Sequence, residues 1–248
     1  MTRQHHGRRD TMMRSVEQRS LSWENEQIST YRLCRSARRR TLALIVRGAE
    51  LVVHAPLTLP MASIEQFMAE KRTWIVGKLA LSAKLPVPSW QEGNQCRYLG
   101  RILTLQFFDG GEVAVAGDRL LMPHLESSLL KKRVSVWYRQ QAMAVFLTRL
   151  EGFVPGLSRL PKALKLSSAR QRWGSCTADG VVRINWRLVQ ASTAEIDYVL
   201  AHELAHLRHM NHSPRFWQEV GRLYPDYALP RQRLKDMGGH YRQIDERS

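Results

Sequence analysis

The pattern His-Glu-x-x-His at residues 202–206 constrains the fold of this chain more than any other part of its sequence. Two histidines four positions apart lie on one face of a helix, one turn apart, so both imidazoles can reach a single metal ion. We therefore predict a helix through this segment, with His202 and His206 as ligands of a zinc ion.

The flanking residues predict where this helix begins and ends. Ser192, followed three residues later by Glu195, is typical of a capping box, and apolar residues then recur at helical spacing. The pair Ser213-Pro214 is typical of the start of another helix. His212 would then lie in a turn between two helices, and its side chain could fold back toward the first of them.

His212 is our first choice for a third metal ligand. Three imidazoles would leave the fourth tetrahedral position of zinc to water, as in catalytic zinc sites. His209 is an alternative because it shares the face of His202 if the helix continues, but three histidines along one helix would span more than about 10 Å. Glu219, on the following predicted helix, is a second alternative.

Glu203 is the predicted general acid/base. Zinc lowers the pKa of bound water to about 7 and polarises a carbonyl or phosphoryl oxygen. Because Glu203 directly follows the first ligand, its carboxylate can lie beside the ion without ligating it, and can carry a proton from the water to the leaving group.

The stretch at residues 171–176, Gln-Arg-Trp-Gly-Ser-Cys, is a predicted rim of the cleft, where a strand and loop could hold an extended peptide by main-chain hydrogen bonds. The alternative is structural, with Trp173 in the core, Gly174 in a turn and Cys176 as a buried thiol. For Cys176 we favour the structural role, because free cysteine usually behaves as a small hydrophobe. Candidates for stabilising an oxyanion are Arg172, Tyr224 and Tyr227.

Composition favours a globular protein. The chain has 248 residues, of which 44% are hydrophobic, and no apolar run approaches the roughly 18 residues of a membrane helix. We see no secretory signal and expect no membrane partner. Three widely spaced cysteines without a C-x-x-C pair argue against a disulfide framework and a cysteine zinc site, so we expect a cytoplasmic protein.

The chain is strongly basic. Its formal net charge of +16 should attract polyanions, and it carries the clusters Arg38-Arg39-Arg40 and Lys131-Lys132-Arg133. We favour solvated surfaces as the explanation of these clusters over nucleic-acid contact, which stays open as a partner.

We predict an α+β fold in four parts. Residues 1–20 are polar and basic and are expected to form a disordered tail, residues 21–125 a strand-rich N-terminal portion, residues 126–240 the catalytic portion, and residues 241–248 a frayed C-terminal tail.

Periodicity predicts the elements within these parts. In the N-terminal portion we expect a small meander of three strands, then a helix capped by Ser63, then two long strands. The catalytic portion should contain a long helix and two strands before the motif helix. The expected strands lie at residues 28–33, 41–46, 50–54, 96–107, 112–122, 163–167 and 181–186, and the long helix at 126–150.

Several motifs, in order along the chain, resemble those of the YgjP-like metallopeptidase family, a bacterial group of predicted metal-dependent hydrolases related to SprT-type zincins. They are Arg172-Trp173-Gly174-Ser175-Cys176, Ile184-Asn185-Trp186-Arg187-Leu188, Asp197-Tyr198-Val199 before the His-Glu-x-x-His pattern, Asn211-His212-Ser213-Pro214-Arg215-Phe216-Trp217, and Tyr224-Pro225-Asp226-Tyr227. The resemblance extends over about residues 21–234.

The resemblance implies a zincin-like metallopeptidase unit, with a small sheet, an active-site helix and a following helix, after a strand-rich N-terminal portion. It implies zinc on His202, His206 and His212, with Glu203 as acid/base. Members are named as peptidases and, in some classifications, as metal-dependent nucleotide pyrophosphatases acting on UTP, and related SprT-type proteases act on DNA-bound proteins. We predict a zinc-dependent metallopeptidase with a peptide or protein substrate, and keep a UTP pyrophosphatase and a nucleic-acid-associated protease or binding module as alternatives.

Overall fold

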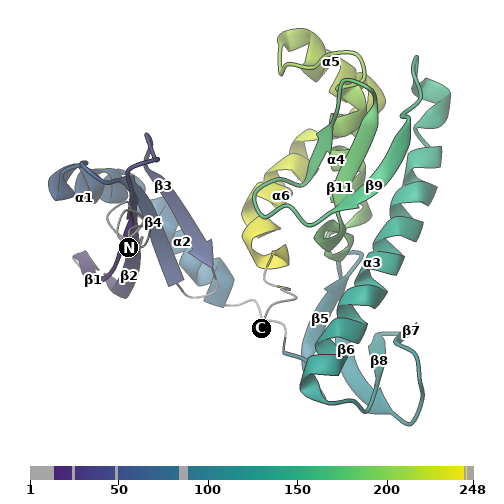
Figure 1. The fold of residues 1–248 in the computed structure, drawn as a ribbon, viewed down its shortest axis with the longest axis horizontal. Coiled ribbons are helices and arrows are strands. Elements are labelled where there is room, and N and C mark those ends of the chain that lie inside the picture. Colours follow the sequence, from purple (N-terminus) through teal and green to yellow (C-terminus); the bar gives the residue numbers. More distant parts are fainter. Residues whose placement is uncertain (1–13, 24–25, 48–49, 84–88, 243, 245–248) are drawn as a thin grey trace, which may run out of the picture. The chain divides into compact units, whose positions relative to one another are not determined.

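The computed structural model describes residues 14–23, 26–47, 50–83, 89–242 and 244. The chain divides into two compact units, Met1–Val87 and Pro88–Ser248. Small mixed sheets and helices make up both units, so the predicted α+β class is confirmed (Figure 1).

The first unit contains a four-stranded sheet of order β1-β2-β4-β3. Its strands are β1 (Arg14–Trp23), β2 (Glu26–Ser36), β3 (Ala43–Arg47) and β4 (Glu50–Pro56). The predicted meander is wrong, because β4 pairs parallel with β2 and leaves β3 at the edge, antiparallel to β4.

The expected disorder of residues 1–20 is also wrong where the structure describes them. Residues 14–20 belong to β1, which runs antiparallel to β2 in a register that begins with Arg14 opposite Ser36. A partner strand satisfies backbone N–H and C=O groups whatever the side chains are, so a polar segment can still form an edge strand. Residues 1–13 lie outside the described residues.

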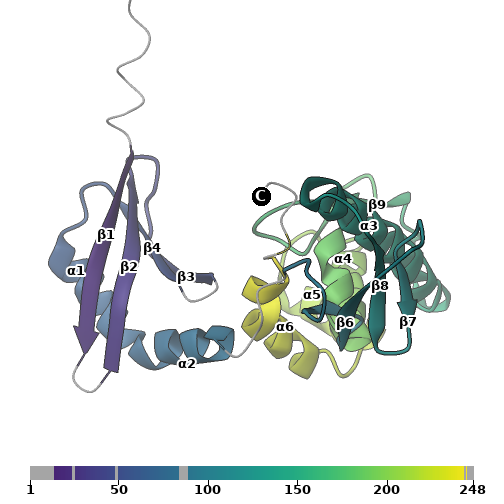
Figure 2. The same cartoon turned by 90° about the horizontal axis from the view of Figure 1, so that it is seen from below.

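Two helices follow this sheet, where one was predicted. They are α1 (Met61–Glu70), which starts after Pro60, and α2 (Arg72–Ala83). Ser63 therefore lies inside α1 and does not cap it. Ile64, Met68 and Ile75 of these helices pack with buried strand residues in one core, on one side of the sheet (Figure 2).

The second unit begins with a sheet of order β5-β6-β8-β7, in which β6 and β8 are parallel. Its strands are β5 (Gln95–Tyr98), β6 (Arg101–Phe108), β7 (Ala114–Ala116) and β8 (Arg119–Pro123). We predicted two long strands here. Turns interrupt them, because Leu99, Gly100 and Gly117 take positive φ values of 50°, 77° and 60°.

The long helix α3 (Ser127–Glu151) confirms the prediction for residues 126–150. It runs from the β5–β8 sheet to the sheet that contains β9 (Figure 1). Buried residues of the sheet that contains β6 and β8, such as Leu105 and Met122, share one core with Val134 and Tyr138 of α3. The predicted division at residues 125/126 is therefore wrong, because it would cut through this core.

The third sheet has the order β10-β11-β9, with β11 parallel to β9 and antiparallel to β10. Its strands are β9 (Ala163–Ser167), β10 (Gly174–Cys176) and β11 (Val181–Asn185), and short 3-10 turns lie at η2 (Val154–Gly156) and η3 (Trp186–Gln190). The predicted strands at 163–167 and 181–186 are confirmed within one residue.

Three helices complete the second unit: α4 (Thr193–Ala205), α5 (Pro214–Leu223) and α6 (Ala228–Tyr241).

The C-terminal residues 241–248 were expected to be frayed, and this prediction is wrong for the first of them. Tyr241 and Ile244 are buried, and the carbonyl of Ile244 accepts a hydrogen bond of 2.7 Å from Nε of Arg187. Residues 243 and 245–248 lie outside the described residues. Within the described part of the chain, no helix is long and apolar enough to cross a membrane.

Candidate metal site and cleft

Helix α4 carries the His-Glu-x-x-His pattern and begins with the predicted capping box. The hydroxyl of Ser192 accepts from the backbone N–H of Glu195 at 3.4 Å, and the Glu195 carboxylate accepts from the backbone N–H of Ser192 at 3.0 Å. The hydroxyl of Tyr241 donates to the same carboxylate at 3.3 Å, which ties α6 to the start of α4. The cap thus fixes the first turn of the helix that positions the histidines.

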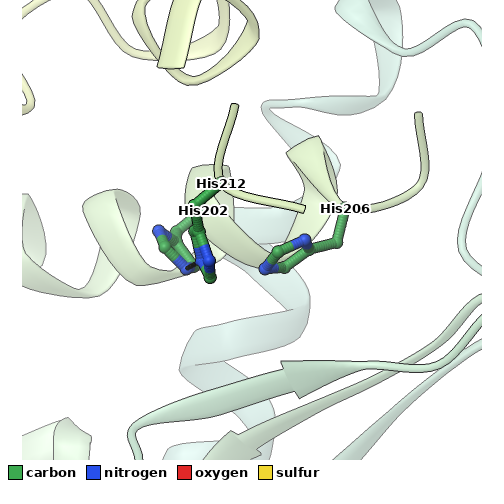
Figure 3. Close-up of side chains that lie close together, drawn as sticks. All are labelled: His202, His206 and His212. Carbon is green, nitrogen blue, oxygen red and sulfur yellow. Dashed lines mark hydrogen bonds between the residues drawn. The ribbon is translucent and has the colours of Figure 1, made fainter. Parts of the chain in front are cut away.

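The structure brings His202, His206 and His212 together. One ring nitrogen from each lies within 4.8 Å of the others, and the Nε2 atoms of His202 and His212 are 3.1 Å apart. Figure 3 shows the three imidazoles turned toward one another, His212 coming from the segment between α4 and α5. This is the fold-back that the Ser213-Pro214 helix start predicted.

His209 is not part of this group, but its backbone contacts it. The carbonyl of His209 lies 3.0 Å from Nδ1 of His206. A proton on Nδ1 would be donated to this carbonyl, which leaves the lone pair of His206 on Nε2. The sequence does not reveal this role of the His209 backbone, because it depends on α4 ending at Ala205.

Glu219 is engaged elsewhere. Its carboxylate accepts from Arg222 at 2.7 and 2.9 Å and from Arg208 at 3.3 Å. The hydrogen bond from Arg222 is the largest cause that lowers the pKa of Glu219. This carboxylate is therefore an ionised partner of two arginines and lies outside the histidine group.

The ring of Phe216 in α5 packs against all three imidazoles of the histidine group. Its ring centroid lies 4.9 Å from that of His202, 4.6 Å from His206 and 4.7 Å from His212, and its side chain is fully buried. From the sequence, Phe216 was notable only as part of the motif that begins at Asn211. No helical spacing predicts this contact, because His212 lies before α5 begins at Pro214.

Burial keeps two of the imidazoles neutral. Desolvation lowers the pKa of His202 to about 3, with smaller contributions from the neighbouring His206 and His212, and it also lowers the pKa of His206. A neutral imidazole has the lone pair that a metal ion requires.

Glu203 is buried beside strand β10, with 5% of its surface exposed. Desolvation raises the pKa of Glu203 to about 8, against the opposing charge of Arg172. A cation held by the three histidines would lower this pKa again. Gly174 lies so close that a Cβ atom there would be 2.4 Å from Oε1 of Glu203.

A cleft of about 630 Å³ opens over the histidines and Glu203. Strand β10 and the residues before it line one wall, and α6 lines another. Of the three oxyanion candidates, Arg172 lines the cleft, whereas Tyr224 and Tyr227 are not among its lining residues. Tyr198, which was not among the predicted site residues, also lines the cleft.

The segment at residues 171–176 forms part of this cleft. Gly174 lies in β10 and not in a turn, and Trp173 and Cys176 are partly buried while lining the cleft. Burial, followed by the negative charge of Glu203, raises the pKa of the Cys176 thiol, which favours its protonated form. The predicted rim is therefore present.

These features define a class: an α+β protein with three histidines that could hold a divalent metal ion, next to a buried carboxyl group in an open cleft. The family model for the YgjP-like metallopeptidase domain matches residues 40–237. The chain therefore belongs to the YgjP-like metallopeptidase family, as its motifs suggested, and membership supports a metal-dependent hydrolase. The comparisons with curated proteins and with solved structures gave no match.

Proposed function

We propose that this protein is a zinc-dependent metallopeptidase with His202, His206 and His212 as ligands and Glu203 as general acid/base. The observation that carries the proposal is the histidine group beside a buried carboxyl group, in one cleft. Tetrahedral zinc with Zn–N bonds of about 2.0–2.1 Å separates two nitrogen ligands by about 3.4 Å. The 3.1 Å between the Nε2 atoms of His202 and His212 is close to this value.

The donor set also fits zinc. Three neutral imidazoles suit zinc, and three protein ligands leave a position open for water or substrate. Zinc bound there would supply Lewis acidity toward the substrate carbonyl and lower the pKa of water.

Glu203 would move the proton in this reaction. Its carboxylate would take a proton from the attacking water and return it to the leaving amine when the peptide bond breaks. Burial supports this role, because it raises the pKa of Glu203 to about 8, and a nearby cation would bring that pKa back toward neutrality.

Strand β10 would hold the substrate. It is an edge strand that lines the cleft, and no other strand among the described residues pairs with its outer side. An extended peptide can add to such an edge by main-chain hydrogen bonds. Arg172, at the same wall, would stabilise negative charge that develops on the carbonyl oxygen.

The test is cleavage of casein and of a peptide library by zinc-loaded protein, compared with Glu203→Ala. We expect cleavage by the unmodified protein and none by the variant, with equal zinc content in both. If no peptide is cleaved under any condition, the proposed function is wrong.

A nucleoside triphosphate pyrophosphatase is the second candidate, because several cationic side chains line the cleft and phosphates are anionic. A phosphate-release panel that includes UTP decides between the two. A role as a nucleic-acid-associated protease or binding module would show as DNA binding that falls steeply with salt and survives Glu203→Ala.

A further inference from the structure

Helix α6 presents one stripe of residues to the cleft. Successive turns of this helix and its C-cap each supply one or two lining residues, and those of neighbouring turns are three or four positions apart, so they share one face. They are Arg231, Leu234, Lys235, Gly238, Gly239 and Arg242. We call Arg231, Lys235 and Arg242 the α6 cations. Helix α6 packs beside α4, which carries the histidine pair (Figure 1).

Aromatic rings hold two of the α6 cations in place. The guanidinium carbon of Arg231 lies 4.2 Å from the ring centroid of Trp217, which follows Phe216 on α5. That of Arg242 lies 4.5 Å from the ring centroid of Trp173, next to Gly174. Stacking uses the flat face of a guanidinium, while the N–H groups in its plane are the ones that bind carboxylates.

Gly238 brings this stripe close to Trp173, the residue before strand β10. A Cβ atom on Gly238 would lie 3.2 Å from the ring of Trp173, so a side chain at residue 238 would crowd that ring. Glycine inside a helix costs about 1 kcal/mol relative to alanine. A requirement for this close approach explains why a helix would carry Gly238 despite that cost.

Most of the charged side chains that line the cleft are positive. Arg172 on the opposite wall adds a fourth cation to the three on α6. Among the described residues that line the cleft, Glu203 is the only acidic one. Asp236 of α6 is not among the lining residues.

The spacing of the α6 cations suits side chains of an extended peptide. Arg231 and Lys235 are separated along the helix by about 6 Å, at a rise of 1.5 Å per residue. Alternate side chains of an extended strand point the same way and are about 6.6 Å apart. Two acidic residues at alternate positions could therefore each meet one cation.

We infer that the α6 cations form a subsite for the carboxylates of acidic side chains, so that the cleft selects peptides with Asp or Glu near the bond that is cleaved. The inference rests on the proposed peptidase function. It adds that the substrate is an acidic segment of a peptide or protein.

The experiment uses a set of peptides that differ only at two alternate positions, which hold Glu, Gln or Lys, and that all have amidated C-termini. Blocking the terminus removes its carboxylate, so only side chains can supply the charge. For the zinc-loaded full chain we expect kcat/KM to be about tenfold higher with Glu than with Gln, and lower again with Lys. Raising the salt concentration should reduce this preference.

The decisive variant is Lys235→Glu, an exposed position that should fold normally. Its matched control is Arg233→Glu, an exposed position on the same helix that does not line the cleft. Lys235→Glu should lose the preference for Glu and favour Lys, whereas Arg233→Glu should behave as the unmodified protein. Equal rates for Glu, Gln and Lys peptides, or equal effects of the two variants, would show that the subsite does not exist.

A binding measurement separates this inference from the proposed function. Fluorescence anisotropy of a labelled Glu peptide, with Glu203→Gln protein and zinc, reports binding without cleavage. If binding depends on Lys235 but no peptide is ever cleaved, the subsite stands and the peptidase function fails. If neither binding nor cleavage depends on Lys235, the inference is wrong even when the protein cleaves peptides.

Discussion

Gly174 of β10 lies directly against the carboxyl group of Glu203, where a side chain on residue 174 would collide with it. A Cβ atom would be 2.4 Å from Oε1, 2.5 Å from Cγ and 2.6 Å from Cδ of Glu203. The edge strand that could hold substrate therefore lies directly against the proposed acid/base.

Gly174→Ala should therefore displace the Glu203 carboxyl group. We expect kcat to fall by about 100-fold, because a misplacement of about 1 Å in a catalytic group has effects of that size. Zinc content, measured by mass spectrometry, should not change. Gly77→Ala in α2 is the control, because a Cβ there meets nothing within 4 Å. Full activity of Gly174→Ala would mean that the position of Glu203 is not critical.

His212→Ala should weaken metal binding by at least about 10-fold, because one of three ligands is lost. His209→Ala should keep the metal, because only the backbone carbonyl of His209 contacts His206, at 3.0 Å. Metal content after dialysis against a weak chelator measures both. The opposite order, with metal lost from His209→Ala and kept by His212→Ala, would contradict the proposed ligand set.

Glu203→Gln should lower kcat by about 1,000-fold or more, since it removes the group that transfers the proton while preserving size. The thermal unfolding temperature should not fall, because a neutral amide is easier to bury than a carboxyl group whose pKa burial raises to about 8. Activity, zinc content and thermal unfolding are measured on the same preparation. Retention of substantial activity would exclude Glu203 as the acid/base.

His240 should make the zinc-free protein less stable in acid. Its side chain is 7% exposed, and burial, followed by the charge of Arg97, lowers the pKa of His240 to about 4. In the unfolded chain a histidine titrates near 6.5. Between these values the unfolded chain binds a proton that the folded protein does not, so stability is full above about pH 6.5 and is lost as the pH falls toward 4.

The size of this effect is a few kcal/mol, at about 1.4 kcal/mol per pKa unit. Urea unfolding of chelator-treated protein at pH 7, 5.5 and 4.5 measures it. The loss should be smaller in His240→Gln and unchanged in His124→Gln, which replaces an exposed histidine. His202 adds to the loss in all three proteins, because burial lowers its pKa to about 3. Equal pH dependence in His240→Gln and the unmodified protein would contradict the prediction.

Elements with strong local signals could be predicted from the sequence. The capping box at Ser192, the helix start at Ser213-Pro214 and the strand at 163–167 all appear as expected. Their hydrogen bonds or side-chain pattern lie within a few residues of one another, so a short window contains the information. The order of the first sheet and the unit boundary were predicted wrongly, because they depend on which distant strands pair and which cores they join.

The sequence by itself determined that His202 and His206 share a helical face, that His212 follows in a turn, and that the chain resembles the family to which it belongs. Helical spacing and capping involve residues that are close together in the sequence, so both can be recognised from the sequence alone. Only the tertiary structure decided that His212 reaches the other two imidazoles, that the carbonyl of His209 contacts His206, and that Gly174 confines Glu203. It also decided that the α6 cations line the cleft. Each of these relationships joins groups through packing and not through a repeating local pattern, and packing is set only when the whole unit has folded.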